Sequence, residues 1–428
     1  MAAALALFGG TPVRTRPYPV HKTTGDAEKA AVLRVLDSGV LSGFEGTNNE
    51  SFHGGSEVRA LEHEWADAFC VRHAIAVNSA TTGLMAAVGA AGIAPGDEVI
   101  VTPFTMSGTI AAILAYQAIP VFVDVTLDTF NLDPAMIEEK ITPRTRAILA
   151  VDIFGHPADM GPTNAIAKQH GLLVIEDAAQ APGARYQGRL AGTLADIGVF
   201  SLNSNKHIQC GEGGVIVTDD DTLAQRARLI RNHAEAVIAS GMHVDSLDNM
   251  VGFNFRMTEL EAAVARCQLT KLDDLLGARL RLVEHLNARL EGIPGVTAAA
   301  VRPGCTHVYY RYAISLNRTL VPIPAGEVVR ALNAEGLEFY VSYMKPLYLQ
   351  PLFQKRIAFG PHGAPFTRAG EDACGAYGRG LCPRAETLED FLISTEIVRP
   401  PQTTADMDEI ADGLLKVLEH ADALMAHR

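Results

Sequence analysis

One lysine, Lys206, lies in a polar turn between two apolar stretches. Residues 197–200 predict a buried strand, residues 215–218 predict a second one, and the glycine-rich residues 211–214 lead into the second strand. Burial lowers the pKa of a lysine, and its neutral amine is a nucleophile toward a carbonyl carbon. A solvated loop lysine is the commoner situation. The interpretation of Lys206 therefore depends on the residues around it in the fold.

A strand-to-helix junction carries small hydroxylic residues. Ser79, Thr81 and Thr82 lie at the junction of an apolar stretch over 74–77 with a helical pattern over 81–91. The first amides of a helix and its dipole attract anions, so this junction could bind a phosphate. A serine or threonine at such a place can equally do no more than cap the helix.

Two further polar residues follow an apolar stretch over 172–175. Asp177 and Gln180 come directly after this predicted strand, at the edge where open α/β sheets bind ligands. Asp177 could hold a protonated ring nitrogen and Gln180 could reach a ring substituent, although either could simply stabilise a turn. A cofactor with a phosphate, a pyridine nitrogen, a phenolic oxygen and an aldehyde needs four such groups. The order Ser79 or Thr81, Asp177, Gln180 and Lys206 therefore predicts pyridoxal phosphate.

The elements that would position these residues alternate between helix and strand from residue 26 to about 221. Strands that are apolar throughout indicate a mostly parallel sheet with both faces covered, which is an α/β domain of three layers. After about residue 250 the pattern changes to a smaller α+β domain, so we predict domains at 1–250 and 251–428. The expected elements of the second domain are a helix over 258–275 that continues into 278–290, strands over 296–301 and 307–314, and helices over 325–334 and 406–424.

Composition narrows the class of protein. The chain has 428 residues, 48% of them apolar, and a net charge of −13 with dispersed Lys and Arg, which argues against nucleic-acid and membrane-surface partners. The start of the chain lacks the basic region of a signal peptide, so we expect a cytoplasmic protein. Six cysteines show no C-x-x-C spacing, and we predict no metal site. Cys210 lies in the lysine turn but has no partner pattern for a nucleophile.

The motifs together resemble the DegT/StrS-type family of fold-type-I pyridoxal-phosphate aminotransferases, which act on nucleotide-linked keto-sugars and on cyclitols. The resemblance covers nearly the whole chain, and its motifs lie at residues 176–180, 198–214, 252–260 and 345–351. It implies that Lys206 forms the covalent link to the cofactor and shuttles a proton. It also implies that Asp177 pairs with the ring nitrogen, Gln180 with the phenolic oxygen, and Thr81, Thr82 and Ser201 with the phosphate. Asn254 would reach the phosphate from the neighbouring subunit of a homodimer with shared active sites.

The chain departs from the family in places. Met106 stands where the family often has an aromatic ring on the cofactor, and a thioether can also pack on a ring face. The loop at 42–56 is longer than expected, which favours a secondary-metabolite or cell-surface sugar pathway. Dehydratase relatives carry histidine in place of the linking lysine. The offsets of Ser201 and of residues 211–214 assign that place to Lys206 rather than to His207.

The expected reaction moves an amino group from glutamate or glutamine to a keto-sugar or a ketocyclitol. His233, Tyr343 and Lys345 are candidate acceptor contacts, although each could be a packed or solvated side chain. Two other functions stay open: a sugar dehydratase, and a catalytically silent sensor or assembly relative. A nucleotide-phosphate loop at 211–214 is disfavoured because the G-x-x-x-x-G-K-[ST] and G-x-G-x-x-G spacings are missing.

Overall fold

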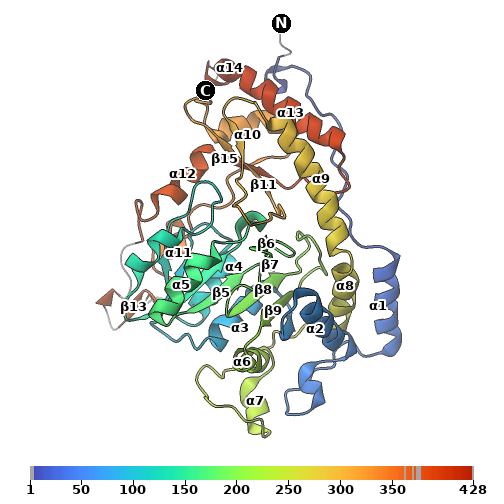
Figure 1. Cartoon of the computed structure of the whole chain (residues 1–428), viewed down its shortest axis with the longest axis vertical. Coiled ribbons are helices and arrows are strands. Elements are labelled where there is room, and N and C mark those ends of the chain that lie inside the picture. Colours follow the sequence, from blue (N-terminus) through green and yellow to red (C-terminus); the bar gives the residue numbers. More distant parts are fainter. Residues whose placement is uncertain (1–3, 361–362, 369–370, 373–376, 427–428) are drawn as a thin grey trace.

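A seven-stranded sheet forms the centre of the computed structural model, which describes residues 4–360, 363–368, 371–372 and 377–426 (Figure 1). β9 pairs antiparallel with β1 and β8, and the other neighbouring strands pair in parallel. The prediction of a mostly parallel sheet is therefore confirmed. In spatial order the strands are β1 (His73–Val77), β9 (Gly214–Thr218), β8 (Ile197–Ser201), β5 (Leu173–Asp177), β4 (Thr145–Val151), β2 (Glu98–Val101) and β3 (Ile119–Phe122).

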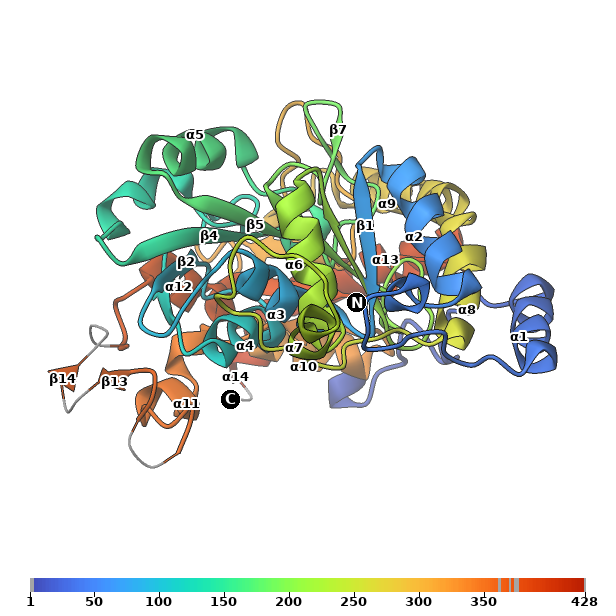
Figure 2. The same ribbon diagram turned by 90° about the horizontal axis from the view of Figure 1, so that it is seen from below.

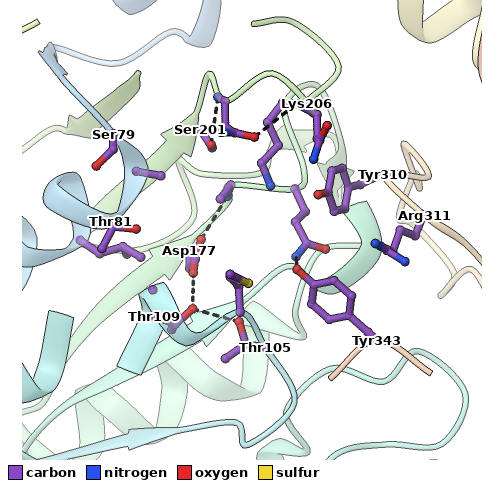
Figure 3. A pocket seen from close by; sticks show the side chains of 18 of the residues that line it. Ser79, Thr81, Thr105, Thr109, Asp177, Ser201, Lys206, Tyr310, Arg311 and Tyr343 are labelled. Atoms are coloured by element: carbon purple, nitrogen blue, oxygen red, sulfur yellow. Dashed lines mark hydrogen bonds between the residues drawn. The ribbon is translucent and has the colours of Figure 1, made fainter. Parts of the chain in front are cut away.

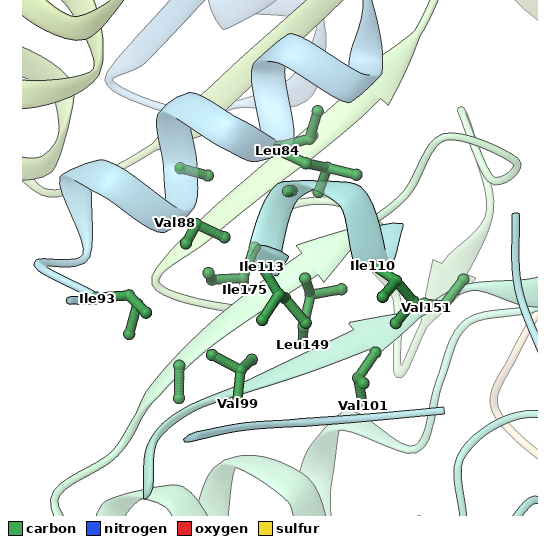
Figure 4. Close-up of a cluster of buried hydrophobic side chains, with 14 of the residues drawn as sticks. Leu84, Val88, Ile93, Val99, Val101, Ile110, Ile113, Leu149, Val151 and Ile175 are labelled. Carbon is green, nitrogen blue, oxygen red and sulfur yellow. The ribbon is translucent and has the colours of Figure 1, made fainter. Parts of the chain in front are cut away.

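Helices cover both faces of this sheet (Figure 2), because successive side chains of a buried strand point to opposite faces. In β1, Ile75 and Val77 join the core under α3, α4 and α6, whereas Ala74 and Ala76 join the core under α2 and α8. Figure 4 shows the first of these cores, between α3, α4 and the strands. The covering helices are α2 (Ser56–Phe69), α3 (Ala80–Ala90), α4 (Ser107–Ala115), α5 (Met160–His170), α6 (Asp221–Arg231) and α8 (Glu259–Leu269).

A second, smaller sheet lies in the C-terminal part of the chain, in the order β10-β11-β15-β12. It packs on α9, α10 and α13, and their core also includes Leu5 from the N-terminal segment. That segment is held by ion pairs, among them Arg14 with Asp406 at 2.8 Å. The elements are α9 (Leu272–Leu290), β10 (Val296–Ala298), β11 (Tyr312–Leu316), α10 (Ala325–Ala334), β12 (Tyr340–Val341), β15 (Leu392–Thr395) and α13 (Thr404–Glu419).

Several predicted elements differ in detail from the observed ones. The helix predicted from 258 to 275 is interrupted at Thr270 and Lys271, so α8 and α9 are separate helices. The last predicted helix is divided at His420 into α13 and α14 (Ala421–Ala426). The strand predicted from residue 307 begins only at Tyr312. The shifted start of β11 is a boundary error, and local sequence signals are weakest at element boundaries.

The remaining parts of the chain connect or flank these layers. The loop at 42–56 contains a single 3₁₀ turn, Glu50–His53. In the described part of the chain no helix is long and apolar enough to cross a membrane. The domain boundary near residue 250 stays a prediction. The remaining helices and strands are α1 (Asp26–Ser38), β6 (Arg185–Tyr186), β7 (Arg189–Leu190), α7 (Ala234–Ala239), α11 (Pro351–Gln354), β13 (Thr367–Arg368), β14 (Glu371–Asp372) and α12 (Pro383–Phe391).

Candidate active site

A cavity of about 420 Å³ lies where the carboxyl ends of β5 and β8 meet the smaller sheet. One wall comes from the amino ends of α3 and α4 and from the turn after β8, and the other from residues beside β11, β12 and β15. Figure 3 shows side chains from both walls converging on one space. The lining includes Ser79, Thr81, Thr105, Met106, Thr109, Asp177, Gln180, Ser201, Asn205, Lys206, Glu212, Tyr310, Arg311, Tyr343 and Glu396.

Lys206 projects into this cavity from the turn after β8. Its backbone N–H donates to the carbonyl of Asn203 at 2.9 Å, and its Nζ lies 4.1 Å from the centre of the Tyr310 ring. Burial lowers the pKa of Lys206 to about 8, and it outweighs the nearby carboxylates of Asp177 and Glu396, which act in the opposite direction. Near neutral pH the lysine therefore presents a useful fraction of reactive, uncharged amine.

Asp177 ends β5 at the base of the cavity, with 5% of its surface exposed. Its Oδ2 accepts a hydrogen bond from Thr109 Oγ1 at 2.8 Å, and its Oδ1 accepts one from the N–H of Ala179 at 3.2 Å. Burial raises the pKa of Asp177, while these hydrogen bonds and the charge of Lys206 oppose the rise. Thr109 and Thr105 also share a hydrogen bond of 2.9 Å, so the carboxylate sits at the end of a fixed polar chain (Figure 3).

The side chain of Gln180 is held in one orientation. Its Oε1 accepts a hydrogen bond from the N–H of Phe154 at 2.7 Å, and its Nε2 lies 3.4 Å from the hydroxyl of Tyr343. Since the oxygen is occupied by the backbone, the NH₂ group is the end available to an acceptor in the cavity. This is the polarity that an anionic phenolic oxygen requires.

The amino end of α3 lines the opposite side of the cavity. Ser79 is the N-cap, and its Oγ accepts the N–H of Thr82 at 3.1 Å. Ser79, Thr81 and Ser201 all line the cavity. Thr82 does not belong to the described lining, because its hydroxyl donates to Asn78 Oδ1 at 2.6 Å, inside the turn. Its predicted contact with a phosphate stays a prediction.

Other predicted site residues divide into two groups. Met106 and Tyr343 line the cavity, and Met106 is 52% exposed. In contrast, His233 is the N-cap residue at the start of α7, and Lys345 lies 4.0 Å from Glu389. Neither residue is among the described residues that line the cavity. Asn254 forms a β-bridge with Asn232, also away from this cavity, and its predicted role in a neighbouring subunit does not require it to line the cavity of its own chain.

Lining residues that were not predicted include Thr109, Tyr310, Arg311 and Glu396. Thr109 lies in the first turns of α4, whose apolar sequence gives no signal of the Asp177 carboxylate that its hydroxyl contacts. The other three lie next to strands of the smaller sheet, Tyr310 and Arg311 before β11 and Glu396 after β15. Their approach to Lys206 depends on how that sheet packs, which no local sequence signal records.

His207, the alternative to Lys206, faces away from the cavity. Its Nε2 is 2.9 Å from the carbonyl oxygen of Val308, and the residue is buried. The lysine, not the histidine, is therefore the residue of this turn that reaches the site. In the described part of the chain, no group of three His, Cys, Asp or Glu side chains is arranged to hold a metal ion.

These side chains fit pyridoxal phosphate on chemical grounds. Lys206 offers a neutral amine for the aldehyde, and Asp177 offers a buried carboxylate for the ring nitrogen. Gln180 offers an amide donor for the phenolic oxygen, and the α3 amino end with Ser201 offers amides and hydroxyls for the phosphate. Each of the four groups of the cofactor thus has a matching partner in one cavity.

Comparisons with known proteins agree with this chemistry. The model of the DegT/DnrJ/EryC1/StrS aminotransferase family matches residues 43–372. The L-glutamine:2-deoxy-scyllo-inosose aminotransferase of Streptoalloteichus tenebrarius is 34% identical, over 100% of both chains. The dTDP-3-amino-3,4,6-trideoxy-alpha-D-glucose transaminase of Streptomyces venezuelae is 35% identical, over 91% of this chain and 92% of that one.

A solved structure shows the same fold. The crystal structure of DesI, determined in the presence of its TDP-sugar product, superposes with a TM-score of 0.82 at 28% identity and covers 99% of both chains. The fold-type-I architecture expected from the sequence is thereby confirmed. The lysine, the carboxylate and the whole-length matches show that this chain is a pyridoxal-phosphate-dependent aminotransferase and belongs to the DegT/DnrJ/EryC1/StrS family.

Proposed function

We propose that this protein transfers the amino group of glutamine or glutamate to the carbonyl carbon of a keto-sugar or a ketocyclitol. The observation that carries the proposal is the position of the Lys206 amine in one cavity with the Asp177 carboxylate and the amino end of α3. The relatives support both halves of the reaction. One is named for glutamine and an inosose, and another for an amino-sugar linked to a nucleotide.

Bound pyridoxal phosphate supplies an electron sink for the carbon from which a proton is removed. In this proposal Asp177 stabilises the protonated ring nitrogen, because a carboxylate in a poorly solvated site interacts strongly with a nearby cation. Thr109 holds the Oδ2 of that carboxylate in place. Lys206 has a pKa of about 8, so its amine accepts and returns a proton near physiological pH.

The two acceptor classes make different demands on the site. A ketocyclitol is a single polyhydroxylated ring, whereas a nucleotide-linked sugar carries a diphosphate and a base in addition. Both classes belong to the proposal, because the relatives include enzymes named for each of them. Of the three predicted acceptor contacts, Tyr343 is the one that lines the cavity among the described residues, and it lies beside Gln180.

The active form in this proposal is a homodimer whose two active sites are shared. Outside the cavity of their own chain, three features lie together: Asn254, His233 and the loop at 42–56. Asn254 forms a β-bridge with Asn232, and the side chain of Asn232 donates a hydrogen bond to the carbonyl of Glu45 in that loop at 2.8 Å. A partner subunit would place Asn254 at the phosphate, in the role that the family resemblance implies.

Absorption spectroscopy tests the function. Protein purified with pyridoxal phosphate should show the visible band of the lysine-bound cofactor, and glutamine or glutamate should abolish that band. A ketocyclitol or a keto-hexose nucleotide should then restore it and yield an aminated product by mass spectrometry. Lys206→Ala should lack the lysine-bound band. A wild-type band that neither amino acid changes would refute the proposed donors.

A further inference from the structure

An arginine and a glutamate face each other where the smaller sheet borders the cavity. β11 and β15 pair antiparallel with Tyr312 opposite Thr395, so Arg311 and Glu396, one residue beyond this pair, lie on adjacent strand ends. The Nη2 of Arg311 donates to the Oε1 of Glu396, and both side chains line the cavity. Strand register, rather than a loop, therefore sets the position of this ion pair.

The guanidinium of Arg311 is well oriented but incompletely hydrogen-bonded. It lies 5.2 Å from the ring centre of Tyr340 and 5.0 Å from that of Tyr343. Its Nη1 makes a long contact of 3.4 Å with Ser394 Oγ, and its buried Nε has no partner within the described residues. An unsatisfied buried donor costs free energy, and a guanidinium is shaped to bind a carboxylate through two N–H groups. A second anion could therefore improve on the present arrangement.

Lys206 and Arg311 are the two cationic side chains among the described residues that line the cavity, and the cofactor engages Lys206. The amino-acid donor brings an α-carboxylate into this space, whereas the ring of the acceptor is uncharged. We infer that Arg311 binds the α-carboxylate of the donor and pairs with Glu396 again when the acceptor ring occupies the site. This inference rests on the proposed function.

When Arg311 changes its partner, neither Arg311 nor Glu396 is left without an oppositely charged neighbour. When Arg311 turns to a donor, Glu396 keeps a second cation, because Nη2 of Arg399 lies 4.0 Å from its Oε2. When the product of the amino-acid donor leaves, Arg311 pairs with Glu396 again. This ion pair then offers N–H groups and carboxylate oxygens that can hydrogen-bond to the hydroxyl groups of the sugar or cyclitol. One cavity can thus receive the anionic donor and then the uncharged ring of the acceptor.

Binding of glutarate, a dicarboxylate without an amino group, tests the inference. Calorimetry on the cofactor-loaded protein should show glutarate affinity about tenfold or more lower in Arg311→Gln, because a charge-assisted hydrogen bond is lost. In Glu396→Gln the affinity should rise, because the competing carboxylate is gone. Arg311→Gln should also raise KM for the donor much more than it lowers kcat. The visible spectrum of each variant checks that the site still holds its cofactor.

Arg330→Gln is the matched control, since it removes the same charge from an exposed helix position where Arg330 pairs with Glu327. Its affinity for glutarate should equal that of the wild type. Arg311→Lys, which keeps the charge but loses the fork, should bind glutarate with intermediate affinity. A purely structural ion pair would predict weaker binding in both Arg311→Gln and Glu396→Gln, and that result would overturn the inference. If the wild type converts donor while Arg311→Gln binds glutarate normally, the inference fails and the proposed function stands.

Discussion

The chemistry of the site begins with one buried amine. Lys206 has a pKa of about 8 in place of the ordinary 10.5, and burial is the main cause. The order of Ser79, Asp177, Gln180 and Lys206 along the chain was enough to predict that they share a site, because strand ends of an α/β sheet meet at one edge. Thr109 was not predictable in the same way, since a threonine within an apolar helix carries no signal of the carboxylate it contacts.

The lowered pKa predicts how fast apoprotein takes up its cofactor. The rate of pyridoxal phosphate binding to Lys206 should rise with pH, with a midpoint near 8, and then level off. The sign follows because only the deprotonated amine attacks an aldehyde. At pH 7 the neutral fraction should be on the order of 300 times that of an exposed lysine. Stopped-flow absorbance measures this rate, and a midpoint near 10.5 would contradict the burial of the amine.

Thr109→Val should impair catalysis through Asp177. The threonine hydroxyl favours the charged carboxylate, so its loss should raise the pKa of Asp177 further, and the acidic limb of the pH–rate profile should move to higher pH. We expect kcat to fall roughly tenfold, the usual effect of one hydrogen bond to a charged group. Thr105→Val, which removes only the next hydrogen bond of the chain, should have a smaller effect on the same profile.

At the level of elements, the start of β9 and the start of α3 are fitted closely together. A Cβ on Gly214 would lie 2.7 Å from the backbone nitrogen of Ala80, so only glycine allows this approach. The apolar patterns of β8 and β9 were predictable, but the reversed direction of β9 was not, because parallel and antiparallel buried strands have similar compositions. The break between α8 and α9 was also missed, since Thr270 and Lys271 are no strong helix breakers.

Gly214→Ala should therefore weaken both the fold and the phosphate end of the site. The added methyl group has to displace the first turn of α3, so we expect a loss of about 1–3 kcal/mol in unfolding free energy and weaker cofactor binding. Gly326→Ala on α10 is the control, because nothing lies within 4 Å of its added Cβ. That variant should gain about 0.5–1 kcal/mol. Chemical denaturation and cofactor titration separate the two outcomes.

For the whole molecule, the cavity is complete only when both sheets are in place. Asp177 and Lys206 come from the large sheet, and Tyr310, Arg311 and Glu396 from beside the smaller one. The site residues that come from the large sheet were predicted well from the sequence. Most of those that lie beside the smaller sheet were not. Their position depends on packing between residues more than a hundred positions apart.

Mixing two inactive variants tests the shared site of the proposed homodimer. Lys206→Ala lacks the linking amine, and Asn254→Asp places a negative charge beside the phosphate of the neighbouring subunit. After the two proteins are mixed and allowed to exchange subunits, a mixed dimer holds one site with both defects and one with neither, so activity should reappear. A mixture that stays inactive despite proven exchange would show that Asn254 serves its own chain.

The N-terminal segment has a consequence for how the chain matures. Leu5 is packed into a core whose other buried members run from Leu282 to Leu424, in the C-terminal part of the chain. The segment around Leu5 therefore lacks the rest of this core until the part of the chain from residue 282 onward has been synthesised. Contacts of such long sequence separation close late and slowly. We therefore expect the smaller sheet and its helices to complete their packing only after most of the chain has been synthesised.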